Sequence, residues 1–288
     1  MPVAYFPFTG EAYQPKMGLK PLAWENLLEF DDKYRDHLDL KRDLFRDHRS
    51  EVMRALPGTE PYCLELNQFL RAHALKFHPS RFRLEGSRFI VAETGESFSE
   101  PASGGEALEQ ISRWVQEDWC LLEPGAPFAL VAGFVCFPSR WSLEEKVGKA
   151  PDAVHEYVPD YKAMLSAPTT NFMGKLTADR PMWRLNWTIH DSDKLFCPGP
   201  HASTKTLTSK NVVANCFLRV ERQTIWRLPS SGAIAFSIRT HLNSLSEVIA
   251  EPGKQKVLYD SLVGLPDETA IYRGMGPFLA PLKEALRC

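Results

Sequence analysis

The chain of 288 residues lacks the short motifs that mark several common enzyme classes. It contains neither Gly-x-Gly-x-x-Gly nor Gly-x-x-x-x-Gly-Lys-Ser/Thr, so nothing indicates flavin, nicotinamide or nucleotide binding by the usual glycine-rich loops. It also lacks the Gly-x-Ser-x-Gly turn of many hydrolases, and no cysteine has an obvious histidine partner. Hydrolysis and nucleotide chemistry within this chain are therefore disfavoured.

Cysteine is sparse, and no two cysteines form a Cys-x-x-Cys pair. This spacing argues against a zinc ribbon or an iron–sulfur cluster held by this chain. Free and mostly buried thiols, as in a cytoplasmic protein, are the expected state. The six cysteines are Cys63, Cys120, Cys136, Cys197, Cys216 and Cys288.

Charge and hydropathy disfavour two kinds of partner. The formal net charge is −2 and the isoelectric point is about 6.5, so nothing favours nucleic acid or an anionic membrane. No apolar run approaches the roughly 20 residues that span a bilayer. The first residues also lack the basic and apolar pattern of a secretory signal. We therefore expect a cytoplasmic protein that binds neither nucleic acid nor membrane.

Three long strands, predicted between residues 183 and 241, carry unusually many polar side chains. The first alternates strictly, with Trp183, Leu185, Trp187 and Ile189 on one face and Arg184, Asn186, Thr188 and His190 on the other. The third places Ala233, Ala235, Ser237 and Arg239 opposite Ile234, Phe236 and Ile238. The small residues leave room either for a flat ligand, whose carboxylate Arg239 would pair, or for a closely packed helix.

The remaining segments predict an α+β fold. Helices are expected between residues 24 and 53, over 63–75, 105–122 and 245–263, with a break in the last near Pro252-Gly253. A hairpin is expected over 81–92 and a doubly buried strand over 128–137. Ser142, Asp152 and Asp160 are predicted caps of three short helices.

A buried strand, several short helices and three long strands follow one another in the order of a PAS-type sheet. We therefore predict a PAS-like antiparallel sheet with a helical flank, which holds ligands between them. Residues 1–125 would form an N-terminal helical and hairpin extension, packed as one compact unit on the region 126–288 with its C-terminal helix.

Two residues stand out as candidates for chemistry. Glu221 lies among three arginines, so it either belongs to a structural salt-bridge network or faces a pocket and balances a cationic substrate. No histidines have zinc-site spacing, but one proximal imidazole is enough to ligate haem. His155 is distinguished by its context, on a short helical segment between the buried strand and the long sheet.

Several segments together resemble one family. They are Phe-Pro-Ser-Arg-Trp at 137–141, Glu-Lys-Val-Gly-Lys at 145–149, Val-His-Glu-Tyr-Val-Pro at 154–159, Trp-Arg-Leu-Asn-Trp at 183–187 and the block 218–241. In this order they are similar to the alpha subunit of haem-dependent oxidative N-demethylase, whose catalytic domain is a PAS fold, and residues 17–22 also fit. The chain departs from the pattern at Tyr157, where a proline is usual, and at His241, where a tyrosine is usual.

The resemblance implies a b-type haem, O₂ as co-substrate, and oxidative removal of a methyl group from a small secondary amine such as dimethylamine, with release of formaldehyde. It makes His155 the predicted iron ligand, with His190, His201 and His241 as rivals. Glu221, Trp187 and Trp226 would hold the substrate ammonium group. The predicted cofactor-binding residues are Arg222, Arg227, Arg239 and Ser237, with the arginines on the haem propionates.

The resemblance also implies partner subunits. Because the chain has no nucleotide loop and no cysteine cluster, electrons from NAD(P)H would arrive through a separate flavin or iron–sulfur reductase subunit. A folate-binding subunit that accepts formaldehyde would be a further partner. The alternative is a haem-binding PAS sensor of gas or redox state, although no kinase, cyclase or DNA-binding output is recognisable; a third is a PAS-like scaffold that has lost haem.

Overall fold

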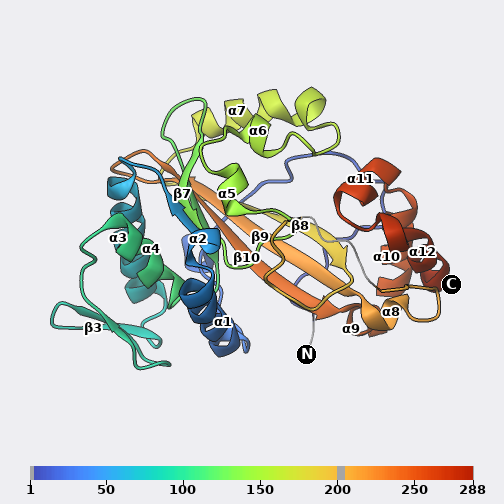
Figure 1. Ribbon diagram of the computed structural model, residues 1–288, viewed down its shortest axis with the longest axis horizontal. Helices are drawn as coiled ribbons and strands as arrows, with labels where there is room; N and C mark the ends of the chain where they lie inside the picture. The colour runs from blue at the N-terminus through green and yellow to red at the C-terminus, as the bar shows by residue number, and fades with distance from the viewer. Residues whose placement is uncertain (1–2, 200–204, 288) are drawn as a thin grey trace.

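The computed structural model describes residues 3–199 and 205–287, and a seven-stranded antiparallel sheet is its centre. The strand order is β1-β8-β9-β10-β6-β7-β2, and every neighbouring pair is antiparallel. A second sheet has the order β3-β4-β5. Together with the helices around them, the sheets confirm the predicted α+β class (Figure 1).

The three long strands of the sequence prediction are confirmed. They are β8 (Met182–His190), β9 (Phe217–Arg227) and β10 (Ile234–Ser244). The short strands of the large sheet are β1 (Lys20–Pro21), β2 (Met53–Ala55), β6 (Asp118–Leu122) and β7 (Leu130–Phe134). All residues of β7 are buried, as a continuous apolar run predicts.

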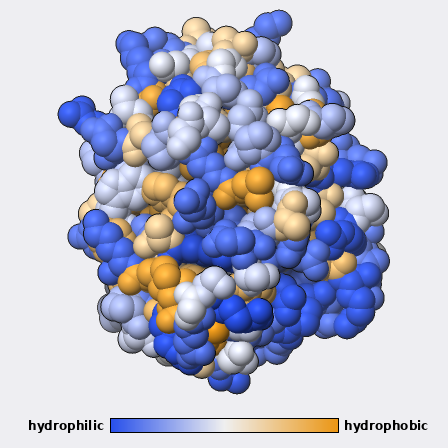
Figure 2. All heavy atoms as spheres, turned by 90° about the vertical axis from the view of Figure 1, so that its left-hand side faces the viewer, coloured by the Kyte–Doolittle hydropathy of each residue, from blue (hydrophilic) through white to orange (hydrophobic). Residues whose placement is uncertain are grey.

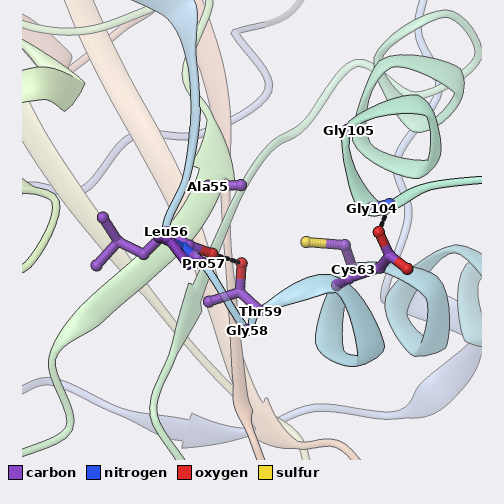
Figure 3. A pocket seen from close by; sticks show the side chains of 9 residues that line it. Ala55, Leu56, Pro57, Gly58, Thr59, Cys63, Gly104 and Gly105 are labelled. Atoms are coloured by element: carbon purple, nitrogen blue, oxygen red, sulfur yellow. Dashed lines mark hydrogen bonds between the residues drawn. The ribbon is translucent and has the colours of Figure 1, made fainter.

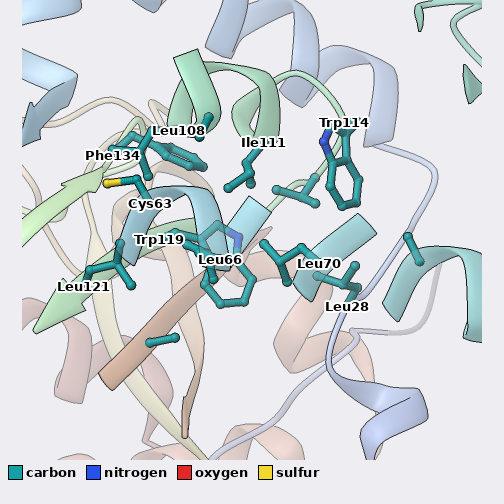
Figure 4. Close-up of a cluster of buried hydrophobic side chains, with 14 of the residues drawn as sticks. Leu28, Cys63, Leu66, Leu70, Leu108, Ile111, Trp114, Trp119, Leu121 and Phe134 are labelled. Atoms are coloured by element: carbon teal, nitrogen blue, oxygen red, sulfur yellow. The ribbon is translucent and has the colours of Figure 1, made fainter. Parts of the chain in front are cut away.

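One end of the sheet is covered by N-terminal helices and the small sheet (Figure 1). These elements are the 3₁₀ turn η1 (Trp24–Asn26), α1 (Tyr34–Asp47), α2 (Arg49–Val52), α3 (Glu60–Phe77), α4 (Gly104–Ser112), β3 (Phe82–Glu85), β4 (Arg88–Val91) and β5 (Ser97–Phe98). The predicted helices before residue 77 and the hairpin are confirmed. In Figure 4, Leu66 and Leu70 of α3 and Ile111 of α4 gather around Trp119 of β6, at the centre of the largest apolar cluster.

The outer surface at this end is mostly hydrophilic. Figure 2 shows the face over α3, α4 and the small sheet, where apolar side chains form only small separate patches. The apolar side chains of α3 and α4 instead point inward, since Cys63, Leu66, Leu70, Leu108 and Ile111 are all fully buried. Burial of these side chains against β6 and β7 holds this end of the sheet together.

The predicted helix over 105–122 is wrong in its second half. Helix α4 ends at Ser112, and residues from Asp118 onward form β6 between β10 and β7. The apolar spacing of Trp114, Val115 and Trp119 fits a helix locally. Pairing with two strands satisfies the backbone of β6 on both sides, and this tertiary context overrides the local pattern.

Short helices lie on the opposite side of the sheet from α3 and α4, over the face that carries Ile225 and Ile234 (Figure 1). They are α5 (Leu143–Lys146), α6 (Pro151–Val154), the π-helical turn η2 (Tyr161–Leu165) and α7 (Ser166–Lys175). The predicted cap of α5 is confirmed, because Ser142 Oγ accepts a hydrogen bond from the Glu145 amide at 3.3 Å.

The two other predicted caps are wrong. Asp152 lies inside α6, whose N-cap is Ala150. Asp160 occupies the position before η2 but has a left-handed backbone and makes no capping hydrogen bond with its side chain. A proline at the first helical position and a strained turn therefore start these segments, in place of carboxylate caps.

The C-terminal helices pack against Ile189, Leu218 and Val220 at the other end of the sheet. They are α8 (Val212–Asn215), α9 (Leu245–Ala250), α10 (Lys254–Val263), α11 (Asp267–Tyr272), η3 (Gly276–Phe278) and α12 (Leu279–Leu286). The predicted break of the helix over 245–263 is confirmed between α9 and α10. None of the helices among the described residues has the length and apolarity needed to cross a membrane.

The predicted boundary between residues 125 and 126 falls between β6 and β7, which are neighbours in the same sheet. Strands β1, β2 and β6 come from the first segment, and they lie in one sheet with strands β7, β8, β9 and β10 of the second. The N-terminal segment thus contributes to the central sheet as well as to its cover.

Gly133 of β7 is required by the close approach of β6. A Cβ atom at this position would lie 2.4 Å from the Trp119 carbonyl oxygen and 2.9 Å from Cys120 Cα. We expect Gly133→Ala to lower the free energy of unfolding by about 3 kcal/mol, because two paired backbones must separate. Urea denaturation measures the loss. The control is Gly125→Ala, where nothing lies within 4 Å; equal midpoints for the two variants would contradict the prediction.

Candidate functional site

The sheet presents a polar cluster around Glu221 on the face toward α5–α7, which we call the flank face. The register of β8 against β9 explains the cluster, because it places Glu221 opposite Asn186 and Gln223 opposite Arg184. Glu221 Oε2 accepts hydrogen bonds from Asn186 Nδ2 at 3.3 Å and Gln223 Nε2 at 3.1 Å. Glu221 is 7% exposed, yet Asn186 beside it is exposed in the middle of the strand. The carboxylate is thus held by amides next to an accessible side chain.

The charge of this single carboxylate acts on three arginines. Arg219 Nε lies 3.6 Å from Glu221 Oε1, and Arg184 Nε donates to Gln223 Oε1 at 2.8 Å. Arg273, just after α11, lies over the Trp187 ring at 4.4 Å and donates to the Trp187 carbonyl. Burial lowers the pKa of all three guanidiniums, and the charge of Glu221 opposes that shift in each. Three guanidiniums against one carboxylate leave an excess of two positive charges.

His155, the predicted iron ligand, follows α6 directly. Its Nδ1 lies 2.8 Å from the Pro151 carbonyl oxygen, which can only accept, so Nδ1 carries the proton. Nε2 has no hydrogen-bond partner among the described residues. Burial first, and then the positive charges of Arg184 and Lys146, lower the pKa of His155 to about 4. The imidazole is therefore neutral at pH 7, with the lone pair of Nε2 available to a metal.

The ring of His155 stacks on Tyr161, the first residue of η2. Their centroids are 4.6 Å apart and their planes differ by 14°. The charge of Arg184 acts on both rings, which places this pair near the flank face. The structure thus places His155 within electrostatic reach of Arg184, whose side chain shares the flank face with Glu221.

The rival histidines have different surroundings. His190 is almost fully buried, and its Nε2 lies 3.1 Å from Ser139 Oγ. His241 lies on the opposite face of the sheet, with Nε2 3.2 Å from Glu29 Oε2. His201 lies outside the described residues. The Nε2 atom of each described rival thus lies against a protein group, whereas Nε2 of His155 has no hydrogen-bond partner among the described residues.

Two of the arginines predicted to bind the cofactor lie on the face opposite the flank face, which we call the arm face. There Arg222 pairs with Glu29 at 3.1 Å, and Arg239 pairs with Asp31 at 2.5 Å. Burial alone would raise the pKa of Asp31, but Arg239 and a hydrogen bond from Gln116 more than offset it and lower that pKa. These pairs fix the N-terminal segment on the sheet.

The other predicted residues are also separated from Glu221. Arg227 donates to the carbonyls of Leu176, Met173, Pro124 and Gly232, and so ties the end of α7 to the sheet. Ser237 is buried on the arm face, 2.6 Å from the Thr224 hydroxyl. Trp226 is fully buried against Trp24, Phe69 and Trp119. Trp187 also points to the arm face, beside Val220, and is connected to the cluster only through Arg273, which lies over its ring at 4.4 Å.

The sequence interpretation gave no role to several members of this cluster. The alternation of residues 183–190 already placed Arg184 and Asn186 on the polar face. Pairing of that strand with β9 brings in Gln223 and Glu221. Arg273 and Tyr161 carried no sequence signal, because only the packing of α11 against the edge of β8 and the turn at η2 bring them to the site.

A small cavity of about 180 Å³ lies away from this cluster, between the starts of α3 and α4. Figure 3 shows Cys63 beside Gly104 on one side of it, and Leu56 and Thr59 on the other. The Gly104 amide donates to Glu60 Oε2 at 3.4 Å, so a carboxylate of the chain already meets the start of α4. Burial raises the pKa of the Cys63 thiol to about 12, which makes it a poor nucleophile.

Comparison with known families agrees with the resemblance found in the sequence. Residues 18–283, nearly the whole chain, match the model of the family described as haem-dependent oxidative N-demethylase, alpha subunit-like. That description names an oxidoreductase that depends on haem, and the term alpha subunit implies that further subunits exist. The chain therefore belongs to the haem-dependent oxidative N-demethylase alpha subunit-like family.

Proposed function

We propose that the chain is a catalytic subunit that binds a b-type haem through His155 and removes a methyl group from a small secondary amine of the dimethylamine type. The observation that carries the proposal is the state of His155. Its Nδ1–H is held by the Pro151 carbonyl, and its Nε2 is unprotonated and without a partner among the described residues. This is the arrangement by which a second-shell carbonyl orients a metal-binding imidazole.

The charge of the flank face supports the same cofactor. Haem carries two propionate carboxylates, and the excess of two positive charges around Glu221 matches them in number. Arg184 and Arg273 are our candidates for these carboxylates, because Arg219 is fully buried and already lies against Glu221. The predicted roles of Arg222, Arg227 and Arg239 remain predictions, and they would require the present protein contacts of these side chains to break.

When bound, haem would supply activation of O₂ and oxidation of the methyl C–H bond. The residues of the chain would bind and orient the amine. Glu221 is a hydrogen-bond acceptor for its ammonium group, and Asn186 and Gln223 keep the carboxylate in place. Trp187 lies on the other face of β8, where its ring packs against Arg273, so its role in holding the ammonium group remains a prediction. The products would be a primary amine and formaldehyde.

Other subunits would complete the reaction. The chain has no glycine-rich nucleotide loop and no paired cysteines, so we propose that a separate flavin or iron–sulfur reductase subunit delivers electrons from NAD(P)H. A folate-binding subunit that accepts formaldehyde would fit the same scheme. We propose that this assembly works in the cytoplasm, without nucleic-acid partners.

The first test is the ultraviolet–visible spectrum of the purified chain, ferric and reduced, before and after addition of dimethylamine. We expect a Soret band that shifts when the amine is added, because the amine binds beside the iron. The control is the same buffer without amine, in which sodium chloride keeps the ionic strength equal. A Soret band that is indifferent to amines would favour the haem sensor, and no band after haem reconstitution would rule out the proposal.

A further inference from the structure

The imidazole of His155 is restrained in two independent ways. The hydrogen bond from Nδ1 to the Pro151 carbonyl fixes which ring edge faces the protein. The near-parallel stack on Tyr161, at 4.6 Å and 14°, restrains the tilt of the ring plane. One contact without the other would leave the ring free to rotate or to rock.

The backbone that presents Tyr161 is unusual. Asp160 has φ 60° and ψ 1°, in the left-handed region that non-glycine residues rarely adopt. The next five residues form the π-helical turn η2 in place of an α-helical one. Strained residues and π-turns concentrate at functional sites, where the surrounding structure maintains them. Here the strained turn ends where the ring of Tyr161 meets His155.

The ring of Tyr161, and not its hydroxyl group, makes the contact with His155. Tyr161 is 5% exposed, and its buried hydroxyl makes no close hydrogen bond within the described residues. Burial raises the pKa of this hydroxyl, and among the polar side chains Thr169 of α7 opposes that shift most, ahead of the charge of Arg184. Phenylalanine could therefore replace Tyr161 with the stack intact, whereas a branched aliphatic side chain could not.

We propose that Tyr161 is a positioning residue, which holds the plane of the His155 ring and thereby the direction in which Nε2 meets the iron. The inference rests on the proposed function, in which His155 ligates the haem. Tyr161 acts through His155 and touches neither the amine nor O₂ in this scheme. Its removal should change the iron–imidazole bond first and activity second.

The test compares the full-length chain with Y161F and Y161L. In the haem-free protein, the ring protons of His155 should show an upfield ring-current shift in NMR spectra, kept in Y161F and lost in Y161L. In the ferrous haem protein, Y161L should displace the iron–imidazole stretching band in resonance Raman spectra. It should also release haem to apomyoglobin about tenfold faster, as loss of an outer-shell partner does, while Y161F stays within about twofold of wild type.

Each result separates the two proposals. A wild-type Raman band and release rate in Y161L would overturn the positioning role, even where His155→Ala shows that His155 is the ligand. An unchanged haem spectrum in His155→Ala would overturn the proposed ligand, and the NMR shift would still report whether the two rings stack. Circular dichroism checks that Y161L is folded; if it is not, Y161M takes its place in the same comparison.

Discussion

Replacing His155 by alanine is expected to lower haem affinity by more than about 100-fold, beyond the range that loss of an outer-shell partner produces. The reason is that His155 Nε2 has no hydrogen-bond partner among the described residues, whereas Nε2 of His190 lies against Ser139 and Nε2 of His241 lies against Glu29. Haem titration followed at the Soret band measures the loss. The side chain is only half-buried and at the end of a short helix, so the fold should survive its truncation.

Two matched variants sharpen this test. His241→Gln removes a rival ligand on the arm face but keeps a group that can reach Glu29, and it should bind haem like wild type. His155→Gly leaves space for exogenous imidazole, which should restore the wild-type spectrum. Haem binding by His155→Ala with wild-type affinity would contradict the assignment and direct attention to His190 and His201.

The strands of the site could be predicted from sequence, but their surroundings could not. Alternation along residues 183–190 is a local property, and it correctly placed Arg184 and Asn186 on one face. Alternation also separates Glu221 from Arg222, because adjacent side chains of a strand point to opposite faces. Which face meets the helical flank is decided by a segment far away in sequence. Glu29 and Asp31 lie on the arm face, and each precedes the arginine that it pairs with by about 200 residues in the sequence.

The wrong helix over 105–122 and the alternatives left open at 233–237 have the same physical cause. Residues 113–122 contain apolar side chains at helical spacing, but pairing of Asp118–Leu122 with both β10 and β7 outweighs that preference. Small residues at 233–237 left two alternatives open, a flat ligand or close packing. Ala233 and Ala235 are fully buried in the main apolar cluster, so close packing accounts for them. Local patterns specify a strand or helix better than they specify what lies against it.

A buried ion pair links this core to the site. Lys41 of α1 is 1% exposed and lies 3.0 Å from Oδ1 of the fully buried Asp118, the first residue of β6. Asp118 Oδ2 accepts from the Phe137 amide at 2.7 Å, and the Phe137 carbonyl accepts from Arg219 at 2.5 Å. Arg219 in turn lies against Glu221. The backbone of Phe137 is thus held from both sides, between the core and the proposed amine site.

We therefore expect Lys41→Met to lower the free energy of unfolding by about 3–5 kcal/mol, because it leaves the Asp118 carboxylate buried without its counter-charge. The adjacent Arg42→Met is the control. Arg42 pairs with Asp39 at 2.6 Å on the exposed side of α1, and an exposed pair contributes less than about 1 kcal/mol. Urea denaturation at pH 7 measures both variants. Similar losses for the two would show that the buried pair has no special role.

The double variant Lys41→Met, Asp118→Asn distinguishes two effects of the single variant. One is the lost attraction between Lys41 and Asp118, and the other is the cost of a buried Asp118 carboxylate without a counter-charge. Asparagine can still accept the hydrogen bond from the Phe137 amide, but it carries no charge that needs Lys41. We expect the double variant to be more stable than Lys41→Met alone, since most of the single-variant loss comes from the uncompensated carboxylate. If both are equally destabilised, the contacts of the Lys41 ammonium group with the Phe134 and Phe137 rings determine the loss instead. Amine affinity is measured for the same variants from the Soret shift. If Phe137 transmits the change through Arg219 to Glu221, the affinity should fall in the variants that lose stability.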